Sequence, residues 1–437
     1  MMSTTPIIPH LIFRCRIVGG VSSEPPPTGG GRGLTTTPPS QARPLISLPS
    51  VPGINTNTSD VIVIGAGIVG LAAAHALLLA GNSVRIVEQS EPGIGQSTRT
   101  GGGIRLAHGS EMNVRLTQLS LPTWLNFEEQ FGIDPHYQET GHLFLSTEDT
   151  GGLTTQAGLL ESLGVHCDVL SKGEISQRWP TLDSMDFTAG NYCKTGGYLD
   201  QHRVIKGFAQ TIQAGGAHLE LRTRVEGILR DGDKVTGVRT SEGSFTSGTV
   251  VNAAGPHAGV ISALAGLEIP FVSRRHELLI LEQTARVPEG IPWLIDTDHQ
   301  VHMRPDGSGR ALVGGFLGHD DPDDPDDYDP ALSERWSTAV REQASQSFHL
   351  SRPDSPVLRG WAGLYPGTVD YLPVLEQSTP GLVTAAGFSG TGLMHAPVVA
   401  QIVADLIREG STSVLDITAL RSRRFDNEQL VVDSTGF

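Results

Sequence analysis

A glycine pattern placed directly after a short β-branched run constrains this chain more than any other feature. Asp60–Ile64 (DVIVI) has the composition of a parallel strand buried on both faces. Gly65, Gly67 and Gly70 follow at once with the spacing G-x-G-x-x-G. In a strand–turn–helix unit the first glycine permits the tight turn, the second lets the backbone approach a pyrophosphate, and the third lets helix and strand pack closely. The pattern therefore predicts a dinucleotide-binding turn in a Rossmann-type α/β domain.

The residues after this turn continue the same pattern. Leu71–Ala80 is rich in Ala and Leu and predicts a helix that stops at Gly81, and Val84–Val87 predicts a second strand that ends at Glu88. The helix N-terminus would face phosphate groups, and Glu88, 18 residues past Gly70, can accept hydrogen bonds from a ribose hydroxyl. An acid at this position disfavours a 2′-phosphorylated ribose, so we do not expect NADP.

The fingerprint alone leaves FAD and NAD open, and three later segments favour FAD. They are Gln96–Arg105 (QSTRTGGGIR), Val250–Gly255 (VVNAAG) and Ala385–Gly392 (AAGFSGTG). A loop rich in hydroxyls and glycines can line a pyrophosphate and a ribityl chain, and small residues at a strand end can lie against a cofactor. A glycine-rich turn before a helix can aim N–H dipoles at a flavin ring. A plain NAD dehydrogenase would usually continue its βαβ winding after the second strand.

Composition excludes several classes of protein. The 437 residues predict two or three domains. Asp plus Glu is 47 and Lys plus Arg is 31, and the net charge of −16 argues against a nucleic-acid partner. No apolar run is long enough for a transmembrane helix. Cys15, Cys167 and Cys193 form neither a disulfide framework nor a metal-binding spacing, so we expect a reducing, cytoplasmic location and no metal.

Residues 1–58 are predicted to be a disordered or targeting tail. They contain ten prolines, four arginines, no lysine and Glu24 as their one acid, and such a segment cannot bury enough apolar surface to fold. An arginine-rich, acid-poor composition is typical of a mitochondrial transit peptide, although the prolines interrupt an amphipathic helix. A dispensable tail, or a translation start assigned too early, is the alternative.

The rest of the chain alternates between predicted helices and strands. Asp320–Asp329, with seven Asp in ten residues, is expected to be a solvated loop, because a calcium loop needs a central Gly and a terminal Glu. We expect a helix over Met112–Phe131, strands over Thr140–Ser146 and His218–Arg224, a hairpin of Val225–Arg230 with Lys234–Thr240, and an antiparallel sheet containing Arg275–Glu282, Gln300–Arg304 and Ala311–Gly315.

These motifs together resemble the D-amino acid oxidase superfamily of FAD-dependent amine oxidoreductases. Within it, the chain is most similar to sarcosine oxidase β-type subunits, glycine oxidase and the β-subunit of dye-linked L-proline dehydrogenase. The resemblance rests on Asp60–Glu88, Ser97–Arg105, Val250–His257 (VVNAAGPH), Arg359–Tyr371 (RGWAGLYPGTVDY) and Ala385–Pro397 (AAGFSGTGLMHAP), spread over about residues 60–410. These motifs are specific for the superfamily and not for the substrate.

The resemblance implies a fold and a reaction. It implies a discontinuous FAD-binding domain over residues 59–135, 200–260 and 355–425, and a substrate domain on a mixed or antiparallel sheet over 136–199 and 261–354. The implied reaction transfers a hydride from the carbon beside an amine nitrogen to the flavin and gives an imine. Sarcosine, glycine, proline and D-amino acids are the substrate types. O₂ or another electron acceptor, and a homo- or hetero-oligomer, remain open.

The resemblance also implies residues for each role. Arg105 would hold the substrate carboxylate, while Tyr365, His276 and His395 would lie near the flavin; for each, a structural salt bridge or an ordinary buried side chain is the alternative. His302 is a further candidate. The expected FAD-binding residues are Gly65, Gly67, Ile68, Val69, Gly70, Glu88, Gln89, Ser97, Thr98, Gly102, Gly103, Val225, Ala254, Gly255, Gly390, Gly392, Leu393 and Met394.

Three departures from the family pattern qualify these expectations. Gly363 occupies the place of a flavin-linking cysteine, and no histidine lies between Gln96 and Arg105, so we expect noncovalent FAD. Leu312, or Arg310 if the alignment slips, stands where some oxidases have a lysine that promotes oxygen reduction. Met394 replaces a second lysine that would contact the carboxylate. The alternatives are therefore a flavin-binding subunit of a hetero-oligomeric dehydrogenase, a non-catalytic assembly factor and an NAD-dependent dehydrogenase.

Overall fold

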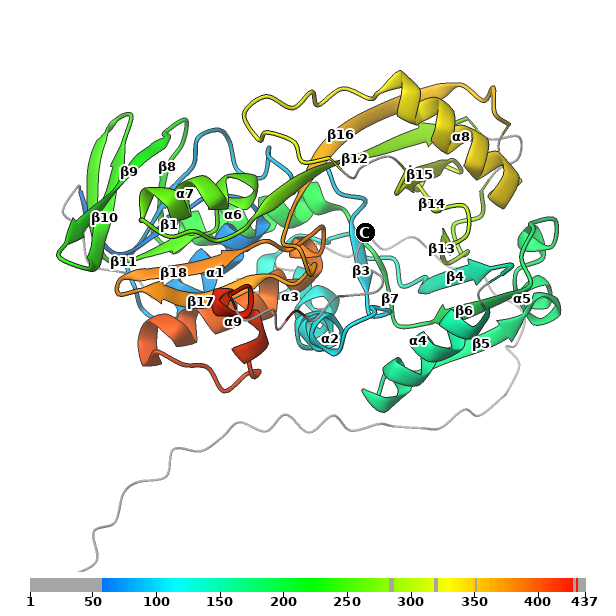
Figure 1. Ribbon diagram of the computed structural model, residues 1–437, viewed down its shortest axis with the longest axis horizontal. Coiled ribbons are helices and arrows are strands. Elements are labelled where there is room, and N and C mark those ends of the chain that lie inside the picture. The colour runs from blue at the N-terminus through cyan, green and yellow to red at the C-terminus, as the bar shows by residue number, and fades with distance from the viewer. Residues whose placement is uncertain are drawn as a thin grey trace, which may run out of the picture. The chain divides into compact units, whose positions relative to one another are not determined.

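The structure is a computed structural model that describes residues 57–148, 150–282, 287–317, 321–349, 352–426 and 430. The tail predicted over residues 1–58 lies outside the described residues, apart from its last two. Thr58, the last of these, already belongs to the first strand, β1. Figure 1 labels the elements in chain order.

The first sheet contains the predicted dinucleotide-binding unit. In the described chain it has eight strands with the order β17-β18-β11-β1-β2-β8, and β10 pairs with β11 and with β9. β1 lies between β11 and β2, both parallel to it. The strands are β1 (Thr58–Ile64), β2 (Val84–Val87), β8 (His218–Glu220), β9 (Val225–Asp231), β10 (Lys234–Thr240), β11 (Gly243–Asn252), β17 (Val374–Thr379) and β18 (Leu382–Ala386).

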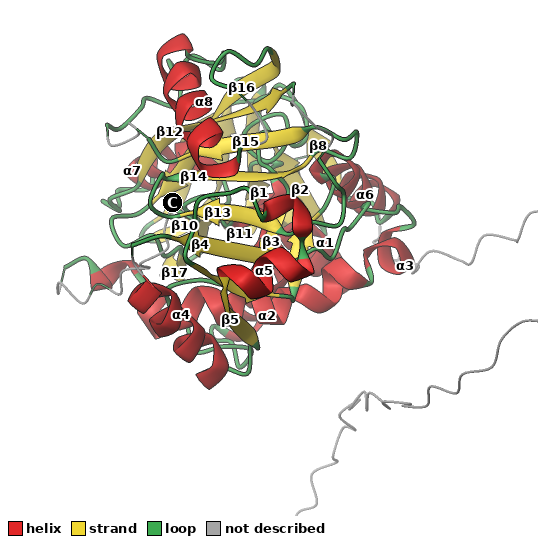
Figure 2. Cartoon of the chain, turned by 90° about the vertical axis from the view of Figure 1, so that its right-hand side faces the viewer, coloured by secondary structure: helices red, strands yellow, loops and turns green. Residues whose placement is uncertain are grey.

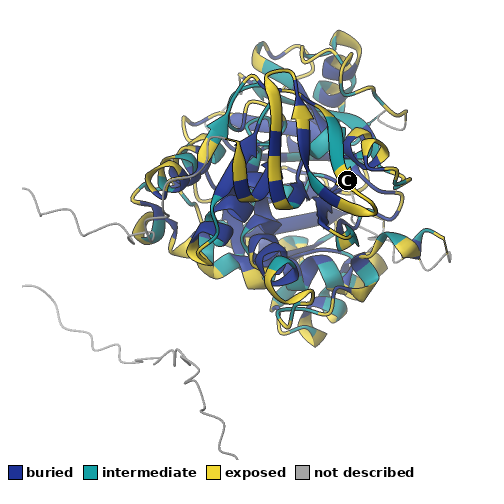
Figure 3. Ribbon diagram, turned by 90° about the vertical axis from the view of Figure 1, so that its left-hand side faces the viewer, coloured by how far each residue is buried: buried dark blue, intermediate teal, exposed yellow. Residues whose placement is uncertain are grey.

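Burial explains why these strands lie at the centre. β11 alternates between exposed and buried residues where it pairs with β10, and is mostly buried where it passes between β1 and β18. Figure 3 colours the chain by burial, seen from the left-hand side of Figure 1. Helices α1 (Ile68–Leu79) and α9 (Gly392–Glu409) pack on each other and on this sheet, and their Ala, Val and Leu side chains form one buried cluster. Small side chains on both helices allow this close packing.

The second sheet carries the other wall of the candidate site. Its order is β16-β12-β15-β14-β13-β4-β6-β5, with eight strands in the described chain, and all neighbours are antiparallel except β13 and β4. The predicted antiparallel sheet is present. The strands are β4 (His142–Ser146), β5 (Cys167–Ser171), β6 (Ala189–Cys193), β12 (Val272–Leu281), β13 (Trp293–Asp296), β14 (Val301–Pro305), β15 (Ala311–Gly315) and β16 (Val357–Gly367).

Two short strands and the remaining helices complete the described chain. β3 (Gly103–Arg105) pairs with β7 (Gly196–Tyr198) in a two-stranded sheet, drawn between the two large sheets in Figure 1. The other helices, shown red in Figure 2, are α2 (Glu111–Leu125), α3 (Phe127–Phe131), α4 (Thr150–Ser162), α5 (Lys172–Arg178), α6 (Gln201–Ala214), α7 (Ala258–Leu264) and α8 (Glu334–Phe348).

Two predicted elements differ from the structure. The single helix expected over Met112–Phe131 is divided into α2 and α3, because Asn126 leaves helical geometry and ends α2. The strand expected over His218–Arg224 ends at Glu220, and Arg222 has a φ of +54°, which a strand does not allow. The division into an FAD-binding and a substrate domain stays a prediction. In the structure β16 belongs to the second sheet.

Candidate functional site

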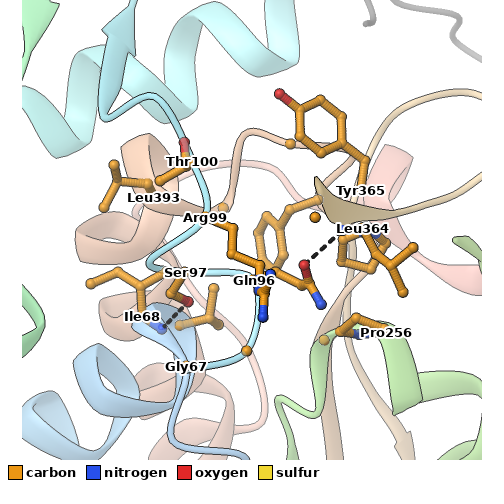
Figure 4. A pocket seen from close by; sticks show the side chains of 18 of the residues that line it. Gly67, Ile68, Gln96, Ser97, Arg99, Thr100, Pro256, Leu364, Tyr365 and Leu393 are labelled. Carbon is orange, nitrogen blue, oxygen red and sulfur yellow. Dashed lines mark hydrogen bonds between the residues drawn. The ribbon is translucent and has the colours of Figure 1, made fainter. Parts of the chain in front are cut away.

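A cavity of about 350 Å³ lies at the carboxyl ends of β1 and β2 and reaches the second sheet. We call it the larger cavity, because the cavity that adjoins it is smaller. Its lining includes the glycine turn after β1, Glu88 at the end of β2, the loop after β11 and the turn before α9. Ligands of open α/β sheets bind at this edge, because the loops and helix N-termini converge there. Figure 4 shows the part of it around Gly67 and Tyr365.

At two of its three glycines, the turn after β1 leaves no room for a side chain. Gly65 has a φ of +101°, and a Cβ there would lie 2.5 Å from the carbonyl oxygen of Ala253. A Cβ on Gly70 would lie 1.9 Å from the Gly65 carbonyl oxygen. Gly67 is different, since its nearest neighbour would be Ser97 Oγ at 3.2 Å. Gly65 and Gly70 are therefore needed for the backbone, and Gly67 leaves open the approach to the helix N-terminus.

Two side chains fix the polar groups around this turn. Ser97 Oγ accepts a hydrogen bond from the Ile68 N–H at 2.9 Å, which Figure 4 shows as a dashed line. The Glu88 carboxylate accepts hydrogen bonds from the N–H groups of Ala66 at 2.7 Å and Ser90 at 2.8 Å. Each carboxylate oxygen keeps further lone pairs for a ribose hydroxyl. The N-terminus of α1 and an anchored carboxylate thus border one cavity, as a dinucleotide requires.

The loop after β2 is tied to β16 of the second sheet. Gln96 Oε1 accepts a hydrogen bond from the Leu364 N–H at 2.6 Å (Figure 4). Arg99 Nη1 donates to the Ala362 carbonyl at 2.9 Å. The indole N–H of Trp361 donates to the Arg99 carbonyl at 2.8 Å. A Cβ on Gly363 would lie 3.1 Å from both Gln96 Oε1 and Arg99 Cβ. Glycine at this position therefore allows the loop to lie against the strand.

A smaller cavity of about 90 Å³ contains the substrate-binding candidates. Its polar and aromatic lining includes Arg105, His142, Trp293, His302 and Tyr365. The two cavities share part of their lining, namely Thr100, Leu278, His302, Phe316, Tyr365 and Gly390. The smaller cavity therefore adjoins the larger one at the second sheet.

Arg105 and Tyr365 meet at the smaller cavity. Arg105 ends β3, is 9% exposed, and its guanidinium carbon lies 5.7 Å from the centre of the Phe144 ring. Tyr365 stacks on His276 with ring centres 3.9 Å apart. Burial raises the pKa of Tyr365 above its usual value, while the nearby Arg105 opposes the shift. Three of the four predicted catalytic residues thus border the adjoining cavities.

The structure does not bring the fourth, His395, into either cavity. Its ring is fully buried between α9 and α2, where Nε2 lies 3.0 Å from Thr117 Oγ1. The ring of His108 lies 5.8 Å away. The sequence placed His395 correctly after the glycine turn, but the first turn of α9 directs its side chain toward α2. The packing matches that of a structural histidine.

Most of the predicted FAD-binding residues line the cavities. The larger cavity is lined by Gly65, Gly67, Ile68, Val69, Glu88, Gln89, Ser97, Ala254, Gly255, Gly390, Gly392 and Leu393, and the smaller by Gly103, Gly390 and Met394. Four of the predicted residues line neither cavity, namely Gly70, Thr98, Gly102 and Val225. Gly70 packs under Gly65, Thr98 Oγ1 donates to the Gly93 carbonyl at 2.9 Å, and Val225 lies in a buried cluster.

Sequence reasoning missed several residues that line the smaller cavity, among them His142, Trp293 and Phe316. His142 lies on a strand that was predicted, where strict alternation places it on the same face as Phe144. Trp293 lies on β13, which was not predicted. A period-two analysis of the Thr140–Ser146 segment could have identified His142, whereas nothing local marks Trp293 or Phe316.

In the described part of the chain, the side chains that line the smaller cavity are either neutral or positively charged. Burial, with Arg105 nearby, lowers the pKa of His142 to about 3 and that of His302 to about 3, so both rings are neutral near pH 7. In the part of the chain that the structure describes, no Asp or Glu lines this cavity. Arg105 is thus its one strongly basic side chain, and an anionic group is the complementary ligand.

The residues present fit a flavin dinucleotide. The glycine turn, the N-terminus of α1 and Glu88 match the adenosine diphosphate part, and the cavity continues past Ser97 to the second sheet. Residues 60–406 match the family model described as FAD dependent oxidoreductase. This chain belongs to that family. FAD is its cofactor, and the chain is an oxidoreductase.

Individual relatives match more than four fifths of this chain. It is 27% identical to glycine oxidase of Pseudomonas aeruginosa over 82% of this chain and 96% of that protein. It is 24% identical to sarcosine oxidase subunit beta of Arthrobacter sp. over 85% and 92%. With 4-methylaminobutanoate oxidase (formaldehyde-forming) of Paenarthrobacter nicotinovorans it shares 25% identity over 84% of this chain, but it spans only 46% of that protein.

A solved structure supports the same fold. The crystal structure of L-proline dehydrogenase from P. horikoshii superposes with a TM-score of 0.78 at 29% identity, covering 86% of this chain and 99% of the other. Among the described residues, no helix is long and apolar enough to cross a membrane. The same residues contain no group of three or more His, Cys, Asp or Glu suited to a metal ion.

Proposed function

We propose that this chain binds FAD noncovalently and oxidises the C–N bond of a small amino acid or secondary amine to an imine. The observation that carries the proposal is the pair of adjoining cavities, one lined by the dinucleotide turn and the other by Arg105. They share Tyr365 and His302, so a substrate in the smaller cavity would lie against residues that also border the larger one.

The larger cavity supplies the groups that would hold the cofactor. The N-terminus of α1 would face the pyrophosphate and Glu88 the ribose. FAD, when bound, supplies the hydride acceptor. Gly363 offers no nucleophile for a covalent flavin link, and a larger side chain there would press on Gln96 and Arg99. These observations support noncovalent binding.

The smaller cavity supplies the substrate contacts. A guanidinium can clamp a carboxylate through two hydrogen bonds, and Arg105 is placed in a largely buried, aromatic environment where that interaction is strong. No described acid lines this cavity to pair with an ammonium group, so the amine would bind uncharged. An uncharged nitrogen has the lone pair that assists loss of the neighbouring hydride. The names of the relatives, glycine oxidase and L-proline dehydrogenase, support substrates of this kind.

Aromatic side chains complete the proposed substrate site. Trp293, Phe316 and Tyr365 line the smaller cavity and reduce its contact with water. A dry site strengthens the attraction between Arg105 and a carboxylate. It also delays hydrolysis of the imine until the product leaves.

An absorption spectrum of the purified chain tests this function first. Absorption bands at ~375 and ~450 nm are expected for a bound flavin. Anaerobic addition of glycine, sarcosine, L-proline or D-alanine should bleach these bands with at least one compound. Acid precipitation should then release the flavin into the supernatant. A colourless chain that cannot be reconstituted with FAD, or a flavin that none of these compounds bleaches, would contradict the proposal.

The relationship to a sarcosine oxidase subunit beta favours a second possibility, that this chain works within a hetero-oligomer. In that case the purified chain would bind FAD but turn over slowly or not at all. Light scattering gives its oligomeric state, and a comparison of dyes with O₂ as electron acceptors gives its turnover. Rapid turnover of the chain alone would exclude the need for a partner.

A further inference from the structure

His302 lies where the two cavities adjoin, and it is one of the residues that line both of them. The residue belongs to β14, and its partner across the ladder on β15 is Gly314. A Cβ on Gly314 would lie 2.3 Å from His302 Nε2, so only glycine leaves room for the imidazole to lie over the strand. The register of β14 and β15 therefore places the ring at the junction.

A neighbouring indole fixes the tautomer of this ring. Trp293 Nε1–H donates a hydrogen bond to His302 Nδ1 at 3.3 Å. A nitrogen that accepts a hydrogen bond carries no proton, so the neutral ring has its hydrogen on Nε2. Among the described residues, no hydrogen bond to Nε2 is observed. The ring thus keeps one donor for a ligand.

The charges around His302 keep it neutral. Burial lowers its pKa to about 3, and the guanidinium groups of Arg105 and Arg304 act in the same direction. Burial and the nearby Arg105 also lower the pKa of His142, which lines the same cavity, so its ring is neutral too. Protonation of His302 would add a positive charge near the guanidinium groups of Arg105 and Arg304. No described carboxylate lines the smaller cavity to offset that charge. The ring therefore acts as an uncharged donor across the physiological pH range.

Trp293 is itself held in place from two sides. Its indole stacks on His142 at 5.6 Å with an interplanar angle of 19°. Cβ atoms on Gly101 and Gly103 would lie 2.7 Å and 3.0 Å from its ring, so the glycine loop that leads to Arg105 rests directly on the indole. One side chain therefore supports both the loop before Arg105 and the orientation of His302.

We propose that His302 donates a hydrogen bond through Nε2–H to the substrate carboxylate beside Arg105, and that Trp293 is the positioning residue that fixes this donor. The inference rests on the proposed function, because it assumes a carboxylate at Arg105. Arg105 supplies a positive charge and several coplanar N–H donors, whereas His302 supplies a single N–H donor without a charge. A carboxylate has lone pairs for both.

Binding of acetate tests the inference, since acetate carries the carboxylate and cannot be oxidised at a C–N bond. Calorimetry on the flavin-loaded chain would give its Kd, with acetamide as the neutral analogue. His302→Leu should raise the Kd for acetate by about tenfold or more, the effect of losing a hydrogen bond to a charged group. His302→Gln, whose amide can donate from a similar position, should recover most of the affinity. The exposed His166→Gln is the matched control and should leave the Kd unchanged.

The outcomes separate this inference from the proposed function. If Arg105→Met does not weaken acetate binding, or wild type does not bind acetate, the carboxylate site and the inference both fail. If Arg105→Met weakens binding while His302→Leu does not, only the inference is wrong.

The tautomer of His302 gives a second measurement. It depends on the hydrogen bond from Trp293, and it would not change if Trp293 only packed against its neighbours. In protein labelled with ¹⁵N-histidine, the His302 signals, assigned by their loss in His302→Gln, should show protonated Nε2 and unprotonated Nδ1 from about pH 5 to 8. Trp293→Phe keeps a ring against the glycine loop but removes the indole N–H. It should give a mixture of tautomers and weaker acetate binding. An unchanged tautomer in Trp293→Phe would overturn the role of Trp293.

Discussion

Arg105 shows how one residue obtains its proposed role from its surroundings. In the sequence it follows three glycines and an isoleucine, and these neighbours do not indicate which charged or neutral groups surround the guanidinium. In the structure β3 pairs with β7, and this pairing places Arg105 opposite Gly196, at the edge of the smaller cavity. The neutral His142 and His302 and the Tyr365 hydroxyl leave the guanidinium as the dominant charge there. The same residue on a solvated loop would bind a carboxylate only weakly.

Replacement of Arg105 tests this at the residue scale. Arg105→Met should raise KM for an amino acid substrate by roughly 10- to 100-fold, since a hydrogen bond to a charged group contributes about 1.5–3 kcal/mol. Arg105→Lys should recover little, because an ammonium lacks the planar fork. Steady-state kinetics gives both values. Arg115→Met is the control, since Arg115 forms an exposed pair with Glu111. An unchanged KM in Arg105→Met would contradict the proposed carboxylate contact.

At the element scale, the turn before α1 combines two kinds of glycine. Gly65 and Gly70 are required by the backbone, whereas Gly67 has an ordinary φ of −71°. We propose that Gly67 is needed instead for the approach of the cofactor. A substitution at Gly67 should therefore act on cofactor binding and leave the fold intact. The distinction follows from distances that the glycine spacing alone does not give.

Gly67→Ala is expected to raise the Kd for FAD by about tenfold or more, which corresponds to about 1.4 kcal/mol. The new methyl group would stand 3.2 Å from Ser97 Oγ, where the pyrophosphate must approach. Fluorescence titration of the apoprotein gives the Kd, and thermal unfolding of the apoprotein should be unchanged. Gly158→Ala on α4 meets nothing within 4 Å and should keep the FAD affinity. Equal effects of the two variants would refute the ligand-specific role of Gly67.

The pairing of β5 with β6 makes a second prediction at this scale. Cys167 and Cys193 are opposite each other in this antiparallel ladder and are free thiols. Opposite residues have Cα atoms about 4.5–5.5 Å apart, which a disulfide can span. Diamide should therefore oxidise the pair, in a Cys15→Ser background, to a 167–193 disulfide that mass spectrometry detects as one linked peptide. Cys193→Ser is the control. Thiols that remain fully alkylatable after diamide would contradict this register.

At the scale of the whole molecule, buried and half-buried histidines make the stability of the fold depend on pH. Burial lowers the pKa of His75 to about 4, and His142 and His302 titrate at about 3. The unfolded chain, with histidines near 6.5, binds more protons than the folded chain between these values and 6.5. The free energy of unfolding should therefore fall as the pH is lowered from about 6.5 toward 4, by up to about 1.4 kcal/mol per pH unit for each histidine.

His75→Leu tests this pH dependence outside the candidate site. His75 packs against Phe131 and Phe208 and lines neither cavity. Urea denaturation at several pH values should show a shallower decline in this variant below pH 6.5, because one proton fewer is taken up on unfolding. A decline as steep as in wild type would show that His75 is not held neutral in the folded chain.

The sequence by itself determined the dinucleotide unit and the cofactor. Strand, glycine turn, helix and Glu88 follow one another within residues 60–88, and their backbone requirements are local, so consecutive residues encode them. Arg105 and Tyr365 were predicted in a different way, from the family resemblance that the motifs around them carry. Only the tertiary structure decided which side chains meet. Trp293 lies between His142 and His302 because β13 lies between β4 and β14, and His395 faces α2 because α9 packs there. Strand order and helix rotation are set by burial of the whole chain, and no local pattern contains them.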